Sequence, residues 1–349
     1  MRFASDNSGP VHPKVMAALE AANDGWALPY GNDPWTERAV QKVRDVFEAP
    51  EAAVYFTATG SAANALALAT ITQPFQTVFC TAEAHIEEDE CNAPEFYTGG
   101  AKLTLVAGDH AKMCPDALAH LLESKAGQNV HGAQMGPLSL TQVTERGTIY
   151  TLTELNALTT VAKANGLPVH LDGARFSNAM AAIGCSAAEM SWQAGVDIVS
   201  FGGTKNGLMA AEAVVIFDPS LAWEFELRRK RGGHLFSKSR YLSAQMDAYL
   251  TDDLWLDMAR LSNAAGQKLA KGLQALPSVK LLHPPDANMI FAALPTAAHR
   301  RLQAAGAQYY PGAGATEAAD DARTNARIVA DWSCPDAHID QFLKLVAGD

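Results

Sequence analysis

The sequence predicts an α/β fold with a mostly parallel sheet and helices on both faces. Short apolar segments bounded by Gly, Pro or Thr alternate with helix-forming segments from about residue 50 to residue 217, and this alternation is typical of strand–helix–strand units. The chain has 349 residues, more than one core usually holds, so we expect a large domain and a smaller one. The predicted strands of the large domain are 52–56, 77–80, 103–106, 138–143, 168–171, 197–201 and 213–217.

The segments on either side complete the predicted architecture. Residues 13–23 and 35–47 have the pattern of amphipathic helices, and a capping-box spacing from Thr151 to Glu154 predicts a helix that ends near residue 165. After residue 217 we expect a long helical region to about 275, strands at 279–282, 289–293 and 326–330, helices at 296–305 and from 335, and a loop at 312–316. The expected parts are an N-terminal arm with helices at 1–50, a large domain at 51–250, and a linking helix with a small α/β C-terminal domain at 251–349.

Charge and composition argue against two classes of protein. The formal net charge of −11 disfavours a nucleic-acid-binding protein, and we interpret the basic run 228–231 as a solvated or subunit-facing stripe of a helix. No apolar segment approaches the roughly 20 residues that a membrane span requires, and the first residues lack the apolar stretch of a signal peptide. We therefore expect neither a nucleic-acid nor a membrane partner.

The cysteines indicate a reducing compartment. The five cysteines are an odd number, are widely scattered and form no C-x-x-C pair. Together with the missing signal sequence, this predicts a cytoplasmic protein.

Two residues at the ends of predicted buried strands, Asp172 and Lys205, are the most informative about function. Asp172 ends the apolar segment 167–171, and Lys205 follows Phe201-Gly-Gly-Thr204. An aspartate beside a pyridine nitrogen keeps that nitrogen protonated so that the ring accepts electrons, while a lysine amine holds an aldehyde as a Schiff base. Desolvation on a loop that leaves a buried strand lowers the pKa of a lysine amine and makes it nucleophilic. The pair predicts pyridoxal 5′-phosphate as the cofactor.

A turn between a predicted strand and an alanine-rich helix, Thr59-Gly60-Ser61, is a candidate phosphate site. Backbone amides and the dipole at a helix start bind a dianion, glycine permits close approach, and hydroxyl groups donate further bonds. Such turns also occur only for packing. The anion site therefore depends on the neighbouring motifs.

His85 follows a predicted strand and could stack its ring on a pyridine. Two alternatives compete: a structural histidine, or a metal cluster with Glu88, Asp89 and Cys91. The sequence offers no second cluster, so we expect no metal.

Two arginines are candidates for binding a carboxylate, because a planar guanidinium fork grips that group. Arg175 lies three residues after Asp172, with which a simple ion pair is the alternative, and Arg327 opens a strand-like segment of the predicted small domain. His131, in a polar stretch before the strand 138–143, is either a surface residue or a site residue.

These motifs together resemble the low-specificity L-threonine aldolases, members of the aspartate-aminotransferase-like, fold-type I group of pyridoxal-phosphate enzymes. The resemblance extends from Ser5 to Arg327. It is specific in the segment His170–Arg175 and loose in the C-terminal quarter. The matching segments are His170-Leu-Asp-Gly-Ala-Arg175, Tyr30-Gly-Asn-Asp33, Thr59-Gly60-Ser61, His85-Ile86 and Ser200-Phe-Gly-Gly-Thr-Lys-Asn206.

The resemblance implies a cofactor site in the large domain. Each matching residue then has a role: Lys205 as the Schiff-base lysine, Asp172 as the pyridinium partner, His85 as the stacking ring, Thr59, Gly60 and Ser61 as the phosphate cradle, and Lys238 as a further phosphate contact.

The resemblance also implies a substrate site shared between subunits. Ser5, Arg175 and Arg327 would hold the carboxylate of an amino-acid substrate, and Tyr30 would reach into the site of a neighbouring subunit of a homodimer or homotetramer.

The chain departs from the family in two places. Thr144 stands where many relatives have a histidine near the substrate hydroxyl, in a Glu-Asn-Thr-His segment that reads Thr-Gln-Val-Thr here, and His131 is the candidate to take its place. The Gly-Gly-Gly-Met-Arg segment of relatives is replaced by residues 232–238, so the identity of the phosphate-binding cation stays open.

The function predicted from these residues is retro-aldol cleavage of threonine and related β-hydroxy-α-amino acids to glycine and an aldehyde. The base for the β-hydroxyl proton is His85 or His131, acting directly or through a water ordered by Asp89. Alternatives are β-elimination or transamination with the same cofactor, and a cofactor-bound regulator without turnover.

Overall fold

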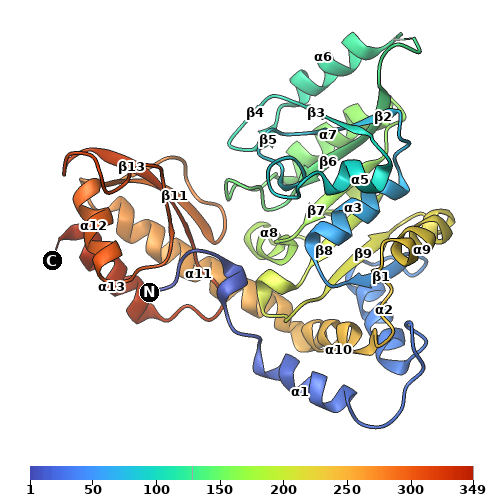
Figure 1. The fold of residues 1–349 in the computed structure, drawn as a ribbon, viewed down its shortest axis with the longest axis horizontal. Helices are drawn as coiled ribbons and strands as arrows, with labels where there is room; N and C mark the ends of the chain where they lie inside the picture. Colours follow the sequence, from blue (N-terminus) through green and yellow to red (C-terminus); the bar gives the residue numbers. More distant parts are fainter. Residues whose placement is uncertain (128, 349) are drawn as a thin grey trace.

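The computed structural model describes residues 1–127 and 129–348. Its main feature is a sheet that, in these residues, has seven strands in the order β1-β9-β8-β7-β6-β2-β3 (Figure 1). The strands are β1 (Ala53–Thr57), β9 (Glu212–Ile216), β8 (Ile198–Gly202), β7 (Val169–Gly173), β6 (Gln134–Thr141), β2 (Gln76–Cys80) and β3 (Lys102–Leu105). From β8 to β3 all neighbouring strands are parallel, whereas β9 is antiparallel to both β1 and β8. The predicted α/β class with a mostly parallel sheet is confirmed.

Helices cover both faces of this sheet. Successive strand residues point to opposite sides, and apolar side chains on both sides need a covering layer. Ile198 and Val214 pack on one face with Leu66 and Phe225, whereas Val199 and Phe201 belong to the larger core on the other face. The helices up to residue 249 are α1 (Pro13–Ala22), α2 (Pro34–Val46), α3 (Gly60–Thr70), α4 (His85–Glu88), α5 (Ala93–Thr98), α6 (Pro115–Lys125), α7 (Leu152–Ala164), α8 (Phe176–Ile183), α9 (Ala222–Arg231) and α10 (Arg240–Tyr249). A small hairpin is formed by β4 (Gly108–Asp109) and β5 (Lys112–Met113).

A second, antiparallel sheet forms the C-terminal part, in the order β10-β11-β13-β12. Its strands and helices are β10 (Lys280–Leu281), β11 (Met289–Pro295), β13 (Arg323–Val329), β12 (Tyr310–Pro311), α11 (Leu254–Gln274), α12 (Thr296–Ala304) and α13 (Asp336–Ala347). In Figure 1 the long helix α11 runs from the large sheet to this smaller unit. The unit has its own core, in which Leu269, Ile290, Ile328 and Phe342 are buried.

The first residues of the chain pack on the C-terminal unit. The amide of Phe3 donates to the carbonyl of Gln308 (2.6 Å), and the amide of Val329 donates to the carbonyl of Phe3 (2.8 Å). The ring of Phe3 packs edge-on against Phe342, with 5.2 Å between centroids. The segment that follows, η1 (Asp6–Ser8), is thereby placed between the two sheets.

The structure contains each predicted strand and refines the helical region after β9. That region is divided into α9, α10 and α11. The first break follows Gly232-Gly233, where Gly233 has φ +77°, and the second lies at Asp252 and Asp253, which also have positive φ values (53° and 54°). A left-handed backbone interrupts the helical hydrogen-bond pattern, so these residues end the helices. The loop predicted at 312–316 is confirmed.

Strand register brings functional groups together at one edge of the large sheet. Thr141, Asp172 and Ser200 are aligned across the ends of β6, β7 and β8. Because β9 is antiparallel, its first residue, Glu212, lies at the same edge, paired with Gly202. No helix of the described residues is long and apolar enough to cross a membrane.

Replacing Thr151 with alanine tests the predicted capping box. Thr151 accepts from the Glu154 amide, and Glu154 bonds back to the Thr151 amide. We expect Thr151→Ala to lower the free energy of unfolding by about 1 kcal/mol, measured by chemical denaturation. Thr153→Ala is the matched control: this exposed residue lies inside α7, and alanine has the higher helix propensity. Equal destabilisation by both variants would contradict the capping interpretation.

Candidate active site

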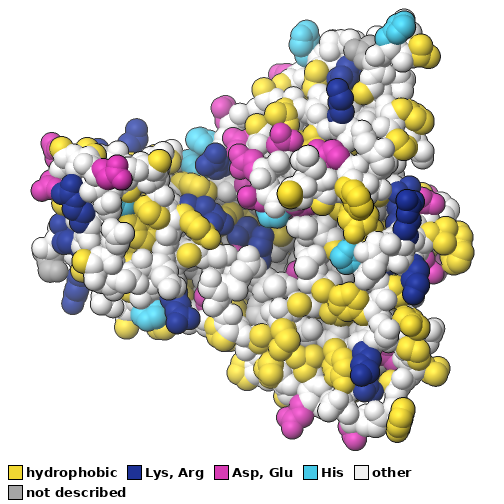
Figure 2. Space-filling model, viewed as in Figure 1, with side chains coloured by type: hydrophobic (Ala, Val, Ile, Leu, Met, Phe, Trp, Pro, Cys, Tyr) yellow, Lys and Arg dark blue, Asp and Glu magenta, His cyan; other side chains and the backbone are white. Residues whose placement is uncertain are grey.

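A cavity of about 270 Å³ opens at the carboxyl edge of the parallel strands. Its walls come from the ends of β6, β7 and β8, the start of β9, the first turns of α3 and α4, and the segments η1 and η3 (Thr204–Asn206). Figure 2 shows Lys, Arg, Asp, Glu and His side chains gathered in the hollow between the two units. The cavity thus has polar walls on a buried scaffold.

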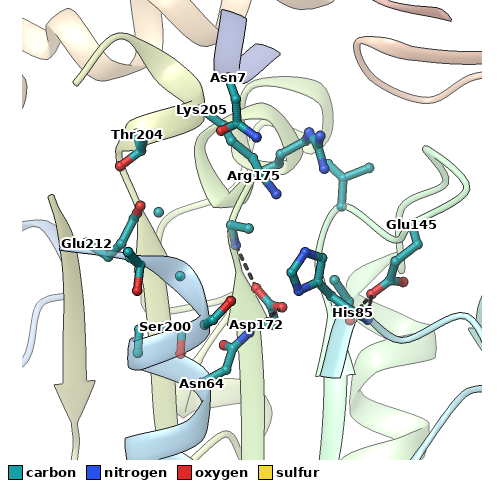
Figure 3. A pocket seen from close by; sticks show the side chains of 18 of the residues that line it. Asn7, Asn64, His85, Glu145, Asp172, Arg175, Ser200, Thr204, Lys205 and Glu212 are labelled. Carbon is teal, nitrogen blue, oxygen red and sulfur yellow. Dashed lines mark hydrogen bonds between the residues drawn. The ribbon is translucent and has the colours of Figure 1, made fainter. Parts of the chain in front are cut away.

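Asp172 and His85 are joined by a buried hydrogen-bond network. Asn64 of α3 donates through Nδ2 to Asp172 Oδ2 (2.8 Å) and to Glu90 Oε1 (2.9 Å), and His85 Nδ1 bonds to the same Glu90 oxygen (2.8 Å). The hydrogen bond to Glu90 raises the pKa of His85 above its ordinary value despite partial burial. The network fixes the Asp172 carboxylate and the His85 ring in the wall of the cavity (Figure 3).

Lys205 reaches the cavity from η3, directly after β8. Burial lowers the pKa of its amine, and the nearby Arg175 guanidinium lowers it further. Glu212 holds the preceding turn, because its Oε2 accepts from the amide of Gly203 (2.7 Å). The loop therefore presents a desolvated amine, the state in which a lysine is nucleophilic.

Arg175 forms a buried, bidentate ion pair. Its Nε and Nη2 donate to the two carboxylate oxygens of Asp6 (2.6 and 2.9 Å), and both side chains are nearly inaccessible. The partner is Asp6 of η1 and not Asp172, so the ion pair with Asp172 considered from the sequence is wrong. Burial raises the pKa of Asp6, but Arg175 outweighs it, and the net pKa is below its ordinary value.

The start of α3 forms part of the cavity wall. Thr59 is the N-cap, and its hydroxyl accepts from the Ala62 amide (3.2 Å). A Cβ on Gly60 would meet nothing within 4 Å, so this turn faces open space. The first amides of a helix have no partners within the helix, and Ser61 adds a hydroxyl to the same wall.

Seven of the predicted site residues line this cavity: Thr59, Gly60, Ser61, His85, Asp172, Arg175 and Lys205. Ser5 and Arg327 lie nearby: Ser5 caps η1 beside Asp6, and Arg327 donates to the carbonyl of Ala4 (3.4 Å). Burial lowers the pKa of Arg327, and the charge of Arg175 lowers it further. Two guanidinium groups, one from each unit, therefore lie close enough to influence each other.

The other predicted residues lie outside the cavity of this chain. Asp89 and Lys238 are exposed, and Tyr30, also exposed, sits with its φ of 63° beside Lys230 of α9. His131 is exposed in the turn before β6, at the opposite end of that strand from Thr141, so the structure does not bring it to the cavity. Among the described residues no group of three or more His, Cys, Asp or Glu side chains is arranged to hold a metal ion.

Thr144 also faces away from the cavity. Its hydroxyl bonds to the hydroxyl of Thr148 (2.7 Å) and lies 3.4 Å from the carbonyl of His110. The next residue, Glu145, lines the cavity instead. Thr144 therefore does not occupy the place in the cavity where many relatives were expected to have a histidine. The side chain that this loop presents to the cavity is the carboxyl group of Glu145.

Sequence reasoning assigned no role to several polar residues of the site, among them Asn7, Asn64, Glu90, Glu145 and Glu212. Asn64 lies three residues after the Thr59-Gly60-Ser61 turn, and Glu145 directly follows the segment that ends at Thr144. A polar residue close to each recognised motif was therefore the available signal. Glu212 opens an antiparallel strand. No sequence signal distinguishes the start of such a strand from a strand end that carries no chemistry.

Comparisons with known proteins find relatives over most of the chain. A family model described as beta-eliminating lyase matches residues 2–296. A low specificity L-threonine aldolase of Pseudomonas aeruginosa is 42% identical over 309 residues, 88% of each chain. Another enzyme of that name, from a Pseudomonas species, is 38% identical over 97% of this chain and 94% of its own. The structure of a threonine aldolase of Leishmania major superposes with a TM-score of 0.91 at 25% identity, covering 99% of this chain and 98% of that one.

The fold and the cavity define an α/β enzyme with a half-buried lysine and a buried carboxylate at the carboxyl edge of its sheet. The chain belongs to the beta-eliminating lyase family.

Removing the carboxylate of Asp6 tests the buried ion pair. We expect Asp6→Ala to destabilise the protein by about 3–5 kcal/mol, because the Arg175 charge stays buried without a partner. Asp257→Ala, which breaks an exposed ion pair with Arg260, is the control and should cost about 1 kcal/mol or less.

The same ion pair has a pH signature. Because the pKa of Asp6 is below the 3.8 of an ordinary aspartate, its stabilisation is present above that pH and is lost as the pH falls through the lowered value. Thermal unfolding from pH 7 to pH 3 measures both effects. Equal losses in the two variants would contradict the assignment.

Proposed function

We propose that the protein cleaves L-threonine, L-allo-threonine and related β-hydroxy-α-amino acids to glycine and an aldehyde, with pyridoxal 5′-phosphate as its cofactor. The observation that carries this proposal is the cavity in which the Lys205 amine, the Asp172 carboxylate and the start of α3 meet. The relatives at 42% and 38% identity, both called low specificity L-threonine aldolases, support the substrate class.

The residues present fit this cofactor. The turn at Gly60 is open to a phosphate group, Asp172 is fixed by Asn64 where it can hold a proton on a ring nitrogen, and His85 offers a flat ring on another wall. Asn64 Oδ1 and Glu145 Oε2 are buried without a hydrogen-bond partner, as expected of a site shaped for a further molecule. When bound, the cofactor supplies an electron-accepting ring next to Cα of the substrate. Lys205 would hold its aldehyde carbon.

The substrate carboxylate is assigned to the two arginines. Asp6 occupies Nε and Nη2 of Arg175, so the remaining nitrogen, Nη1, is free to bind an anion, and Arg327 approaches from the other unit. A carboxylate held at two points fixes the orientation of the bonds around Cα. This positioning decides which bond at Cα is broken, because the cofactor alone does not select it.

A panel of β-hydroxy amino acids tests the proposal. We expect the purified holoprotein to form equal amounts of glycine and aldehyde, with acetaldehyde from threonine, and Lys205→Ala to form neither. Borohydride reduction fixes the cofactor on the amine that holds it, and peptide mapping should find the label on Lys205. Pyruvate or ammonia without glycine would point to β-elimination, which the description of the family model keeps in view.

We further propose a cytoplasmic homo-oligomer, a dimer or a tetramer, with sites shared between subunits. Large apolar side chains are exposed around Tyr30 and α9: Trp26 (104%), Leu28 (69%), Trp223 (68%) and Leu227 (47%). In Figure 2 apolar side chains also gather over the lower part of the molecule, where Figure 1 places α1 and α10. Such patches are unusual on monomers, and Tyr30 within one of them would lie against the partner.

Mixing two inactive variants tests whether Tyr30 acts in a partner's site. We expect Tyr30→Ala and Lys205→Ala homo-oligomers to have little activity. A mixture of the two that is unfolded and refolded should regain roughly a quarter of the wild-type activity, because about half of the dimers are hybrids and one of the two sites of each hybrid is intact. Glycine formation before and after mixing is the measurement. No recovery in hybrids verified by native mass spectrometry would place Tyr30 outside the partner's site.

A further inference from the structure

Glu145 is a half-buried residue of the cavity wall, and the proposed function has assigned no task to its carboxyl group. It lies in the loop after β6, opposite the turn that carries Lys205 (Figure 3). Its Oε1 accepts from the backbone amide of His85 (2.8 Å) and from the hydroxyl of Thr141 (2.8 Å). Its Oε2 is buried and has no hydrogen-bond partner among the described residues. One oxygen therefore holds the side chain in place, and the other is unpaired but closed off from solvent, so a substrate hydroxyl group reaches it only when the carboxyl group turns toward the cavity.

Asp172 and Glu212, the other carboxyl groups of the cavity wall, have no buried oxygen without a hydrogen-bond partner among the described residues. Asp172 accepts from Asn64 at Oδ2 and from the Ala174 amide at Oδ1 (3.0 Å). Glu212 accepts from the Gly203 amide at Oε2 (2.7 Å). Among the described lining residues, Glu145 is thus the carboxyl group with a free oxygen.

The two histidines considered as bases are less well placed. His131 is exposed before β6. His85 lines the cavity, but its Nδ1 is bound to Glu90, and stacking on a cofactor ring would occupy its face. Glu145 lies on the same wall as His85, joined to it through the His85 amide, so the carboxyl group borders the space next to that ring.

The surroundings of Glu145 suit a group that gains and loses a proton near neutral pH. Burial, followed by the charge of Asp172 on β7, raises its pKa to about 7, although the hydrogen bonds from Thr141 and His85 act in the opposite direction. Cys80 at the end of β2 and Tyr150 are the other titratable groups that interact with it. A pKa near the working pH is optimal for proton transfer.

We propose that Glu145 is the residue that exchanges the proton of the substrate's β-hydroxyl group. The inference rests on the proposed function. Glu145 Oε2 takes the hydroxyl proton; the O–H electron pair becomes the second bond of the aldehyde carbonyl, and the Cα–Cβ pair stays with Cα, which is later protonated to give glycine. Atoms and charge balance, because one proton leaves oxygen and one is added to carbon. In the reverse direction Glu145 returns the proton to the aldehyde oxygen.

The variant Glu145→Gln separates this role from structural support. The amide oxygen can still accept from His85 and Thr141, but the side chain no longer takes up a proton. We expect kcat for threonine cleavage to fall by about 10²–10⁴, with little change in KM. Exchange of the α-proton of glycine with deuterated water, followed by NMR, needs the cofactor site but no β-hydroxyl group and should stay close to the wild-type rate. Glu88→Gln, an exposed carboxyl group on α4, is the matched control and should change neither reaction.

The pH dependence and a direct titration give two further measurements. Because the carboxylate is the base, kcat/KM of the wild type should fall as the pH drops through about 7, and Glu145→Gln should lack this limb. In protein without cofactor, with glutamate labelled at the side-chain carboxyl carbon, one ¹³C resonance should titrate near neutral pH and be absent in Glu145→Gln. This second readout does not depend on turnover.

The outcomes are distinguishable. The proposal would be overturned if Glu145→Gln cleaved threonine at the wild-type rate or kept the wild-type pH profile. It would also be overturned if the variant lost cleavage and glycine exchange equally, because Glu145 would then only hold His85 in position. Failure of the wild type to form glycine from any β-hydroxy amino acid would instead overturn the proposed function, whereas the titration of Glu145 would still be observed.

Discussion

The buried ion pair between Arg175 and Asp6 joins the three segments that enclose the cavity. Asp6 belongs to the N-terminal segment, Arg175 precedes α8 at the edge of the large sheet, and Asn288, just before β11 of the small sheet, donates to the same carboxylate (3.1 Å). A charge pair in a poorly solvated position is favourable only when its geometry is good and the remaining atoms are bonded. The bidentate contact and the third donor meet that condition. The two units and the N-terminal segment therefore meet in one defined arrangement, and Arg327 is brought toward Arg175.

Burial has different consequences for the acids and bases around the cavity. It lowers the pKa of the Lys205 amine, whereas a hydrogen bond to Glu90 raises that of His85 and burial raises that of Glu145. The charged forms of these groups lose hydration, and each shift depends on which neighbour compensates the loss. Side chains within one small cavity thus differ in their affinity for protons. This separation suits a reaction in which several protons move between oxygen, nitrogen and carbon.

The order of strands and helices could be predicted from local sequence patterns, because the parallel strands are short apolar segments that end at polar residues. The strands at 168–171 and 197–201 and the capping box at Thr151 are confirmed, and Asp172, Lys205 and Gly60 line one cavity. His131 was a weak candidate on the sequence alone, because a residue that precedes a parallel strand lies at the amino end of that strand, opposite the edge at which the cavity opens. Thr144 and Glu145 showed the limit of this reasoning, since adjacent residues in a loop point to opposite sides and only the folded loop shows which one faces the cavity.

The sequence by itself determined the alternation of strands and helices, the lysine and aspartate at strand ends, and the glycine at a helix start, because these depend on the chemistry and spacing of neighbouring residues. Only the tertiary structure decided which charges meet. Asp6 lies 169 positions from Arg175, Asn64 lies 108 from Asp172, and His85 lies 60 from Glu145. Contacts between such distant residues depend on strand order and on the antiparallel insertion of β9. Local sequence patterns contain neither.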